Sequence, residues 1–303
     1  MPEGVRFRWL GVAGVEIRAQ GCTLAIDPYL TRIPFRSLWF GRVRSSAELV
    51  ARHLPQCDFV LLGHAHFDHI LDAPALLRQT GALALGSANS CRLLSVCGVP
   101  PERIRQVNPG DRLELFDLGL PLAGERERGR GDGLRLEVYP VAPHSLPGFR
   151  PGPLAPHLRP PLRARDYRMD RVLAYLLEVG EQRLLFDLPE GRLPPGPIDV
   201  LFAPPLPGGR AQDDERLAAV LAALRPRLFV PIHWDDMWQP LAQPVRPLLA
   251  PTGKLWPPLA RLDLAEFART VRRLSPQTAV QTSVLIPERL REYDLAALLA
   301  RSR

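Results

Sequence analysis

The run His64-Ala65-His66-Phe67-Asp68-His69 places four candidate metal ligands within six positions, directly after the apolar segment 59–63. Neutral imidazole and carboxylate groups are ligands that zinc, iron and manganese accept. Side chains alternate in an extended chain, so His64 and His66 can point the same way and chelate one ion. Asp68 and His69 fall where the chain turns into a helix and can reach a second ion. The spacing predicts a metal site rather than isolated core or surface histidines.

This run cannot complete the coordination of two ions, so further ligands are required. Of the seven histidines in the chain, His144 and His233 each follow a strand-like segment, LEVYPVAP and RLFVPI respectively. Asp187 likewise ends the strand-like segment RLLFD. A single strand-end residue is usually a turn or a cap. Together, however, these residues would meet the 64–69 run at one edge of a sheet.

Apolar and alternating segments predict the elements that would position these ligands. The expected strands are 5–9, 14–21, 22–28, 59–63, 112–116, 134–141, 171–179, 183–187, 200–204 and 227–233. Helices are expected at 70–80, around 217–224, from the capping pair Asp263 and Glu266 to Leu274, and over the last dozen residues. This order of elements is typical of a layered α/β fold, with 1–303 forming one domain.

The composition narrows the class of protein. A chain of 303 residues that is 46% hydrophobic can bury a sizeable core. It contains no apolar stretch of about 18 residues, so no transmembrane helix is expected. Its start lacks the apolar segment of a signal peptide, so a cytoplasmic location is expected. The four cysteines form no CxxC pair and are expected to be free thiols.

The net charge of +7 is compatible with an anionic substrate, nucleic acid or an acidic membrane surface. Lys254 is the only lysine, an arginine bias that a GC-rich genome would also produce. No dense basic run with interleaved aromatics occurs, so no nucleic-acid partner is expected. Peripheral membrane contact and a homo-oligomer are compatible with the sequence.

Prolines and arginines suggest how the rim of the site is built. The 34 prolines crowd into 140–161, 189–207 and 240–258, close to the proposed ligands, where they would stiffen loops. The insert at about 145–171 carries six arginines against two aspartates. Placed over the site, it would favour a small anionic substrate; a solvated basic loop explains the same residues equally well.

The order of these ligands resembles that of the metallo-β-lactamase superfamily. The chain is most similar to the branch that holds the L-ascorbate-6-phosphate lactonases and the N-acylphosphatidylethanolamine phospholipase D enzymes. This finer resemblance rests on Trp9-Leu10-Gly11, on Ile26-Asp27-Pro28-Tyr29-Leu30 and on Ile232-His233-Trp234-Asp235, and it spans about residues 5–240.

The resemblance implies a four-layer αββα sandwich, the metallo-β-lactamase fold, with the site at one edge of the paired sheets. It implies a first metal ion on His64, His66 and His144, and a second on Asp68, His69 and His233, with Asp187 bridging. The family usually has Gly-Asp-Thr or Ser-Asp-Thr at the bridging position, whereas this chain has Phe186-Asp187-Leu188-Pro189 and lacks the hydroxyl.

Two divalent ions, zinc with manganese or iron as alternatives, would generate a metal-bound hydroxide at neutral pH. Asp68 is the expected catalytic residue, because it would orient that hydroxide while ligating the second ion. The predicted function is metal-dependent hydrolysis of a phosphodiester or lactone/ester bond in an anionic small molecule or lipid headgroup. A nucleic-acid-processing nuclease of the same fold and a non-catalytic metal-binding protein remain alternatives. His157 is a candidate general acid, although a surface-loop histidine is the commoner interpretation.

Overall fold

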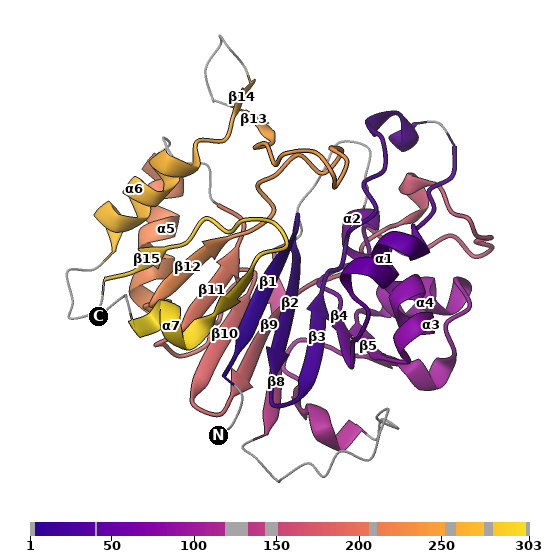
Figure 1. Ribbon diagram of the computed structural model, residues 1–303, viewed down its shortest axis with the longest axis horizontal. Helices are drawn as coiled ribbons and strands as arrows, with labels where there is room; N and C mark the ends of the chain where they lie inside the picture. Colours follow the sequence, from indigo (N-terminus) through magenta and orange to yellow (C-terminus); the bar gives the residue numbers. More distant parts are fainter. Residues whose placement is uncertain are drawn as a thin grey trace.

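The protein is a sandwich of two mixed β-sheets with helices on both outer faces (Figure 1). The computed structural model describes residues 4–39, 41–118, 133–142, 151–205, 211–251, 259–275 and 281–300. Within these ranges the first sheet has seven strands, in the order β16 (Glu292–Asp294), β1 (Arg6–Gly11), β2 (Gly14–Ala19), β3 (Cys22–Ile26), β4 (Phe59–Leu61), β5 (Leu83–Gly86) and β6 (Ile104–Gln106).

The described part of the second sheet also has seven strands. Their order is β15 (Ser283–Val284), β12 (Leu228–Pro231), β11 (Val200–Ala203), β10 (Gln182–Phe186), β9 (Val172–Val179), β8 (Leu134–Val141) and β7 (Arg112–Glu114). A separate pair, β13 (Leu249–Pro251) and β14 (Leu259–Arg261), is antiparallel. Strands β3, β4, β5 and β6 are mutually parallel, as are β10, β11, β12 and β15.

The main core lies between the two sheets. Phe7 and Trp9 of β1 alternate with partly exposed arginines and are 1% and 0% exposed, so strand alternation turns their rings inward. The ring of Phe7 meets that of Phe202 on β11 edge-on, with centroids 5.1 Å apart. Phe186 at the end of β10 stacks on the same ring at 4.9 Å. Aromatic packing thus joins the sheets next to the segment that follows β10.

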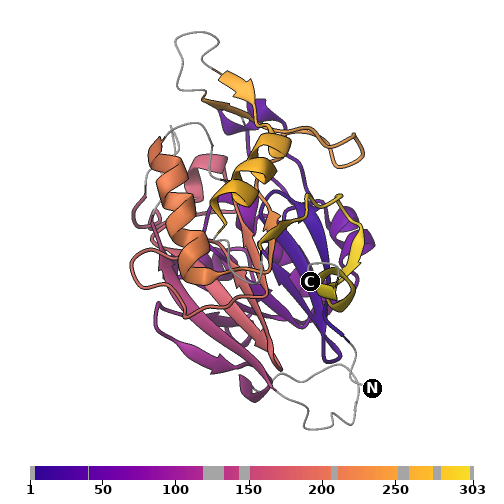
Figure 2. The ribbon, with the colours of Figure 1, turned by 90° about the vertical axis from the view of Figure 1, so that its left-hand side faces the viewer.

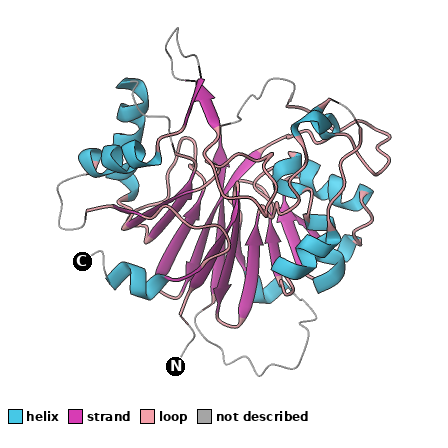
Figure 3. Ribbon diagram, turned by 45° about the horizontal axis from the view of Figure 1, so that its top comes forward, coloured by secondary structure: helices cyan, strands magenta, loops and turns pink. Residues whose placement is uncertain are grey.

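Helices cover both outer faces (Figures 2 and 3). The first sheet packs against α1 (Ala47–His53), α3 (Ala73–Thr80) and α4 (Ala88–Val96), and the second against α5 (Ala211–Leu224) and α6 (Leu264–Leu274). The Asp263 carboxylate accepts a hydrogen bond from Glu266 N and starts α6, as the capping pair predicts. Helix α7 (Leu295–Ala300) follows β16. The four-layer αββα sandwich expected from the sequence is confirmed.

The ends of the parallel strands meet at one edge of the sandwich, where hydrogen bonds join the sheets. Leu173 N, at the start of β9, donates to Gly63 O at 2.8 Å, and the Tyr175 hydroxyl donates to Leu62 O at 2.7 Å. His233 N, just beyond β12, donates to Val12 O in the β1–β2 turn at 2.7 Å. Segments far apart in sequence are therefore held together at this edge.

No helix in the described ranges is long and apolar enough to cross a bilayer. All four cysteines are free thiols, as the sequence predicts.

Candidate metal centre

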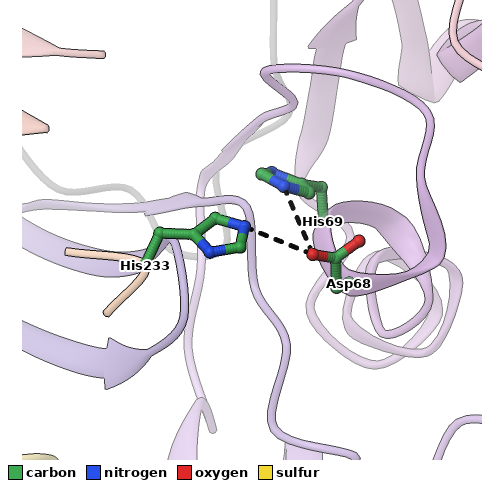
Figure 4. A group of neighbouring side chains, drawn as sticks. All are labelled: Asp68, His69 and His233. Atoms are coloured by element: carbon green, nitrogen blue, oxygen red, sulfur yellow. Dashed lines mark ion pairs between the residues drawn. The ribbon is translucent and has the colours of Figure 1, made fainter. Parts of the chain in front are cut away.

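Helix α2 (Phe67–Ile70) and the end of β12 bring Asp68, His69 and His233 together (Figure 4). Asp68 Oδ2 lies 3.3 Å from His233 Nε2 and 3.6 Å from His69 Nε2. One ligand atom from each of the three residues lies within 4.8 Å of the other two. Asp68 and His69 are buried, and His233 is half-buried. Two imidazoles and a carboxylate, from both sheets, fit one divalent ion.

His64 and His66 form a neighbouring pair of donors. His64 Nε2 lies 3.1 Å from His66 Nδ1, and the His64 ring centroid is 3.7 Å from that of His69. The two nitrogen atoms therefore face the same space, as alternation just beyond β4 predicts. His144, the third ligand expected with this pair, lies outside the described residues.

Asp187 lies at the same edge, directly after β10. It lines the same cavity as the histidines, and its charge contributes to raising the pKa of His69. Its Oδ1 accepts a hydrogen bond from Leu188 N at 2.7 Å. The carboxylate thus lines the cavity that both groups of histidines line, and its bridging role stays a prediction.

Asp27 also belongs to the site, and the sequence analysis did not predict a role for it. Its Oδ2 lies 2.8 Å from His69 Nδ1, and its Oδ1 accepts a hydrogen bond from Gly63 N at 2.7 Å. The Asp27 carboxylate beside Nδ1 orients the ring so that Nε2 of His69 points toward Asp68, and metal-binding histidines commonly present their second nitrogen to a carboxylate in this way. A Cβ atom at Gly63 would lie only 2.7 Å from Asp27 Oδ2, so glycine permits this approach.

The available signal for Asp27 was its position directly after β3, at the edge that also carries His64. That position does not say which group the carboxylate contacts.

Burial and charge set the protonation of the cluster. Burial alone would raise the pKa of Asp68, but His69 and His233 hold it well below its usual range. Burial alone would lower the pKa of His69, but Asp27 and Asp68 raise it to about 9. Burial, followed by the neighbouring His69 and His66, lowers the pKa of His64. At neutral pH Asp68 is therefore ionised and His64 neutral, the forms that bind metal ions, whereas His69 is protonated and would release a proton on binding one.

Unusual backbone geometry is concentrated here. Seven non-glycine residues in the described ranges have a positive φ, and four of them lie at this edge: Val12 at 49°, Asp27 at 44°, Asp187 at 69° and His233 at 56°. Such conformations cost energy and persist where the surroundings enforce them, which is typical of functional sites.

A cavity of about 160 Å³ lies at this edge, and its polar side, here called its floor, is formed by Asp27, His64, His66, Asp68, His69, Asp187 and His233. Its walls are mainly apolar and comprise Ala13, Ile26, Val172, Leu173, Tyr175, Phe186, Pro204 and Ile232. Among the described residues no arginine or lysine lines it. The site therefore combines a polar, titratable floor with apolar walls.

Residues 151–171 of the expected insert pack along the helical layer of the first sheet. Leu162 O accepts a hydrogen bond from Val43 N at 2.8 Å, and Asn89 of α4 donates to Arg168 O at 2.8 Å. His157 is exposed and does not line the cavity. Residues 145–150 of the insert lie outside the described ranges, so its expected place over the site stays a prediction.

Known proteins share parts of this sequence and its fold. Residues 16–151 match the metallo-β-lactamase superfamily model. A UPF0173 metal-dependent hydrolase from Pyrobaculum arsenaticum is 26% identical over 232 residues, which cover 76% of this chain and 84% of the relative. Another, from Anaeromyxobacter sp. (strain K), is 32% identical over 96 residues, 31% of each protein, so that match spans about a third of the relative's length.

Among solved structures, the fold is similar to that of Igni18, a metallo hydrolase from Ignicoccus hospitalis, with a TM-score of 0.54 and 18% identity. That match covers 96% of this chain and 99% of Igni18. At this identity the likeness shows the fold alone. The chain therefore has the fold of the metallo-β-lactamase superfamily, and it matches that superfamily over the residues that carry the HxHxDH run.

Proposed function

We propose that this protein is a metal-dependent hydrolase. The observation that carries the proposal is the cluster of Asp68, His69 and His233, whose ligand atoms lie within 4.8 Å of one another on the floor of a cavity. Its sequence relatives are named metal-dependent hydrolases. The proposal assigns a first ion to His64, His66 and His144, a second to Asp68, His69 and His233, and a bridging role to Asp187.

The donor set supports a divalent ion. Imidazole nitrogen and carboxylate oxygen suit zinc, and they also suit manganese and iron. When bound, such ions lower the pKa of water and polarise the oxygen of the bond to be cleaved.

The chain's own groups prepare the reaction. Asp27 holds the Nδ1 side of His69, so that Nε2 faces Asp68. Asp68 stays ionised, and its carboxylate can accept a hydrogen bond from an attacking water and orient it. The apolar walls limit the access of bulk water and strengthen the electrostatic interactions on the floor.

The proposed substrate is a phosphodiester or a lactone/ester in an anionic small molecule or lipid headgroup. The net charge of +7 supports an anionic partner, and the apolar walls would accept its non-polar part. The resemblance to the lactonase and phospholipase D branch supports the same two bond types.

The test is to load the purified protein with Zn²⁺ or Mn²⁺, measure its metal content, and assay bis-p-nitrophenyl phosphate together with simple lactones and esters. Asp68→Ala should reduce the rate by on the order of 100-fold or more, because it removes both a ligand and the group that orients water. Asp58→Asn is a matched control, because Asp58 accepts a hydrogen bond from Thr23 N at the opposite end of β3.

A metal-loaded wild type that is inactive across the panel would contradict the proposal, as would an Asp68→Ala variant with full activity. Fewer than one bound ion per chain would favour the non-catalytic alternative. Salt-dependent RNA binding together with RNA cleavage would favour the nuclease.

A further inference from the structure

A buried ion pair lies behind His233, outside the candidate metal site. Arg32 Nη2 lies 3.2 Å from Asp235 Oδ2, and each side chain is only 1% exposed. Arg32 belongs to the loop that follows β3 of the first sheet, whereas Asp235 follows His233 by two residues. Removing two charges from water costs free energy that their attraction can fail to recover. Stability alone therefore does not explain why this pair is buried.

The other oxygen of Asp235 reaches the turn that supports His233. Asp235 Oδ1 accepts a hydrogen bond from Val12 N at 2.7 Å. Val12 O accepts one from His233 N at 2.7 Å and one from Trp9 Nε1 at 2.9 Å. The Val12 peptide groups thus connect the carboxylate of Asp235 to the backbone of His233.

This connection holds two unfavourable backbone conformations. Val12 has a φ of 49° and His233 a φ of 56°. A β-branched residue such as valine rarely adopts a positive φ, so the turn needs external support. The bonds on both sides of the Val12 backbone provide that support.

The structure around Arg32 is shaped to receive its guanidinium group. The group lies over the Tyr29 ring, 5.3 Å from the centroid. A Cβ atom at Gly11 would lie 1.9 Å from Arg32 Nη2, and Gly11 has a φ of 98°. Only glycine therefore leaves room for this guanidinium beside the β1–β2 turn.

We propose that Arg32 is a positioning residue for His233. Through Asp235 and Val12, it fixes where the end of the second sheet presents His233 Nε2 to Asp68 on the first, and so it sets the affinity of the second-ion site. This inference rests on the proposed function, because it assumes that His233 and Asp68 share an ion.

The test measures binding of Zn²⁺ alone to the metal-free full-length chain, by calorimetry and by competition with a chromophoric chelator. Co²⁺ absorption spectra report the geometry of each ion. Arg32→Met should lower the affinity for the second ion by about 10-fold or more and change the Co²⁺ spectrum of that site. Groups that orient metal ligands have effects of this size. The first ion should be unaffected. Arg32→Lys keeps the charge and should lose less affinity than Arg32→Met.

Arg227→Met is the matched control. Arg227 pairs with Asp199 at 3.0 Å beside β12, and that pair lies outside the site. This variant should leave both ions unchanged, which separates positioning from a general loss of stability. His233→Ala provides the reference for loss of the second ion.

The outcomes separate the two proposals. If the wild type binds fewer than two ions, the two-ion assignment fails. If the wild type binds two and His233→Ala loses one, but folded Arg32→Met binds both with wild-type affinity and spectrum, the role of Arg32 is overturned. Equal losses in Arg32→Lys and Arg32→Met would also overturn the ion-pair explanation.

If Arg32→Met does not fold, the double variant Arg32→Met/Asp235→Asn decides, because it leaves no unpaired buried charge and keeps an oxygen for Val12 N. A lower affinity for the second ion in that variant supports the proposal, and wild-type affinity contradicts it.

Discussion

At the scale of single residues, Asp27 makes two contacts that one substitution separates. In Asp27→Asn the side-chain oxygen can still accept the hydrogen bond from Gly63 N, but the amide group presents a donor to His69 Nδ1. His69 must then carry its proton on Nε2, which blocks that nitrogen as a ligand. We expect affinity for the second ion to fall by about 10- to 100-fold while the fold is retained.

The measurement is Zn²⁺ titration in competition with a chelator, with thermal unfolding monitored by circular dichroism. Asp58→Asn again serves as the control, since its carboxylate also caps a backbone N–H beside β3 but is remote from the cavity. Unchanged Zn²⁺ affinity in Asp27→Asn would show that Asp27 does not orient His69.

Residue types and their positions after strands predicted which of these side chains lie close together. The run 64–69, Asp187 and His233 follow strands whose ends share one edge, so simple alternation and topology suffice to bring them close together. The contacts of Asp27 and the pair of Arg32 with Asp235 were not predicted. They join loops distant in sequence, and such contacts leave no periodic pattern.

At the scale of secondary-structure elements, the aromatic contact between the sheets supports the site. Phe202 on β11 is fully buried between Phe7 and Phe186, and Phe186 directly precedes Asp187. We expect Phe202→Ala to reduce the free energy of unfolding by about 3–5 kcal/mol, because it leaves a cavity at the centre of the core.

Urea denaturation gives this value directly. Ile286→Ala is the comparison: the side chain is 39% exposed, and the change should cost less than about 1 kcal/mol. Equal losses in the two variants would mean that β11 does not pack as described.

The long strands, several short strands and the amphipathic helices were predicted from apolar and alternating segments, whereas other short elements were not. The helix expected at 70–80 is confirmed as α3 from residue 73, with Pro74 in its first turn, where proline needs no hydrogen-bond partner. Strands β5 and β6, of four and three residues, were missed, although β4 and β7, which have three residues each, were predicted as parts of the segments 59–63 and 112–116. Helix α4 was missed as well, although Ser87 caps its start.

At the scale of the whole molecule, metal binding should stabilise the fold, because the proposed ligands come from both sheets. A ligand that binds only the folded state adds about 2.7 kcal/mol at 100 times its Kd. We therefore expect treatment with a chelator to lower the Tm by several degrees and Zn²⁺ to restore it.

Differential scanning calorimetry of the chelated and Zn²⁺-saturated protein tests this expectation. Zn²⁺ should raise the Tm of His233→Ala less than it raises the Tm of the wild type. Identical Tm values with and without Zn²⁺ in the wild type would contradict binding at a site shared by the two sheets.

The fold class was predictable because the alternation of buried strands with helices restricts the ways in which a chain can be layered. The contact between the two sheets at the site edge was not predictable, because it depends on individual hydrogen bonds such as that from His233 N to Val12 O.

This contact between the sheets has a consequence for the biogenesis of the protein. Asp68 and His69 lie in the first quarter of the chain, whereas His233 comes from the last third, so a ribosome completes the first two donors long before the third. A nascent chain cannot assemble the Asp68–His69–His233 centre until the second sheet has docked on the first. Occupancy of that centre would therefore follow the docking of the two sheets, and it would mark chains in which both sheets are in register.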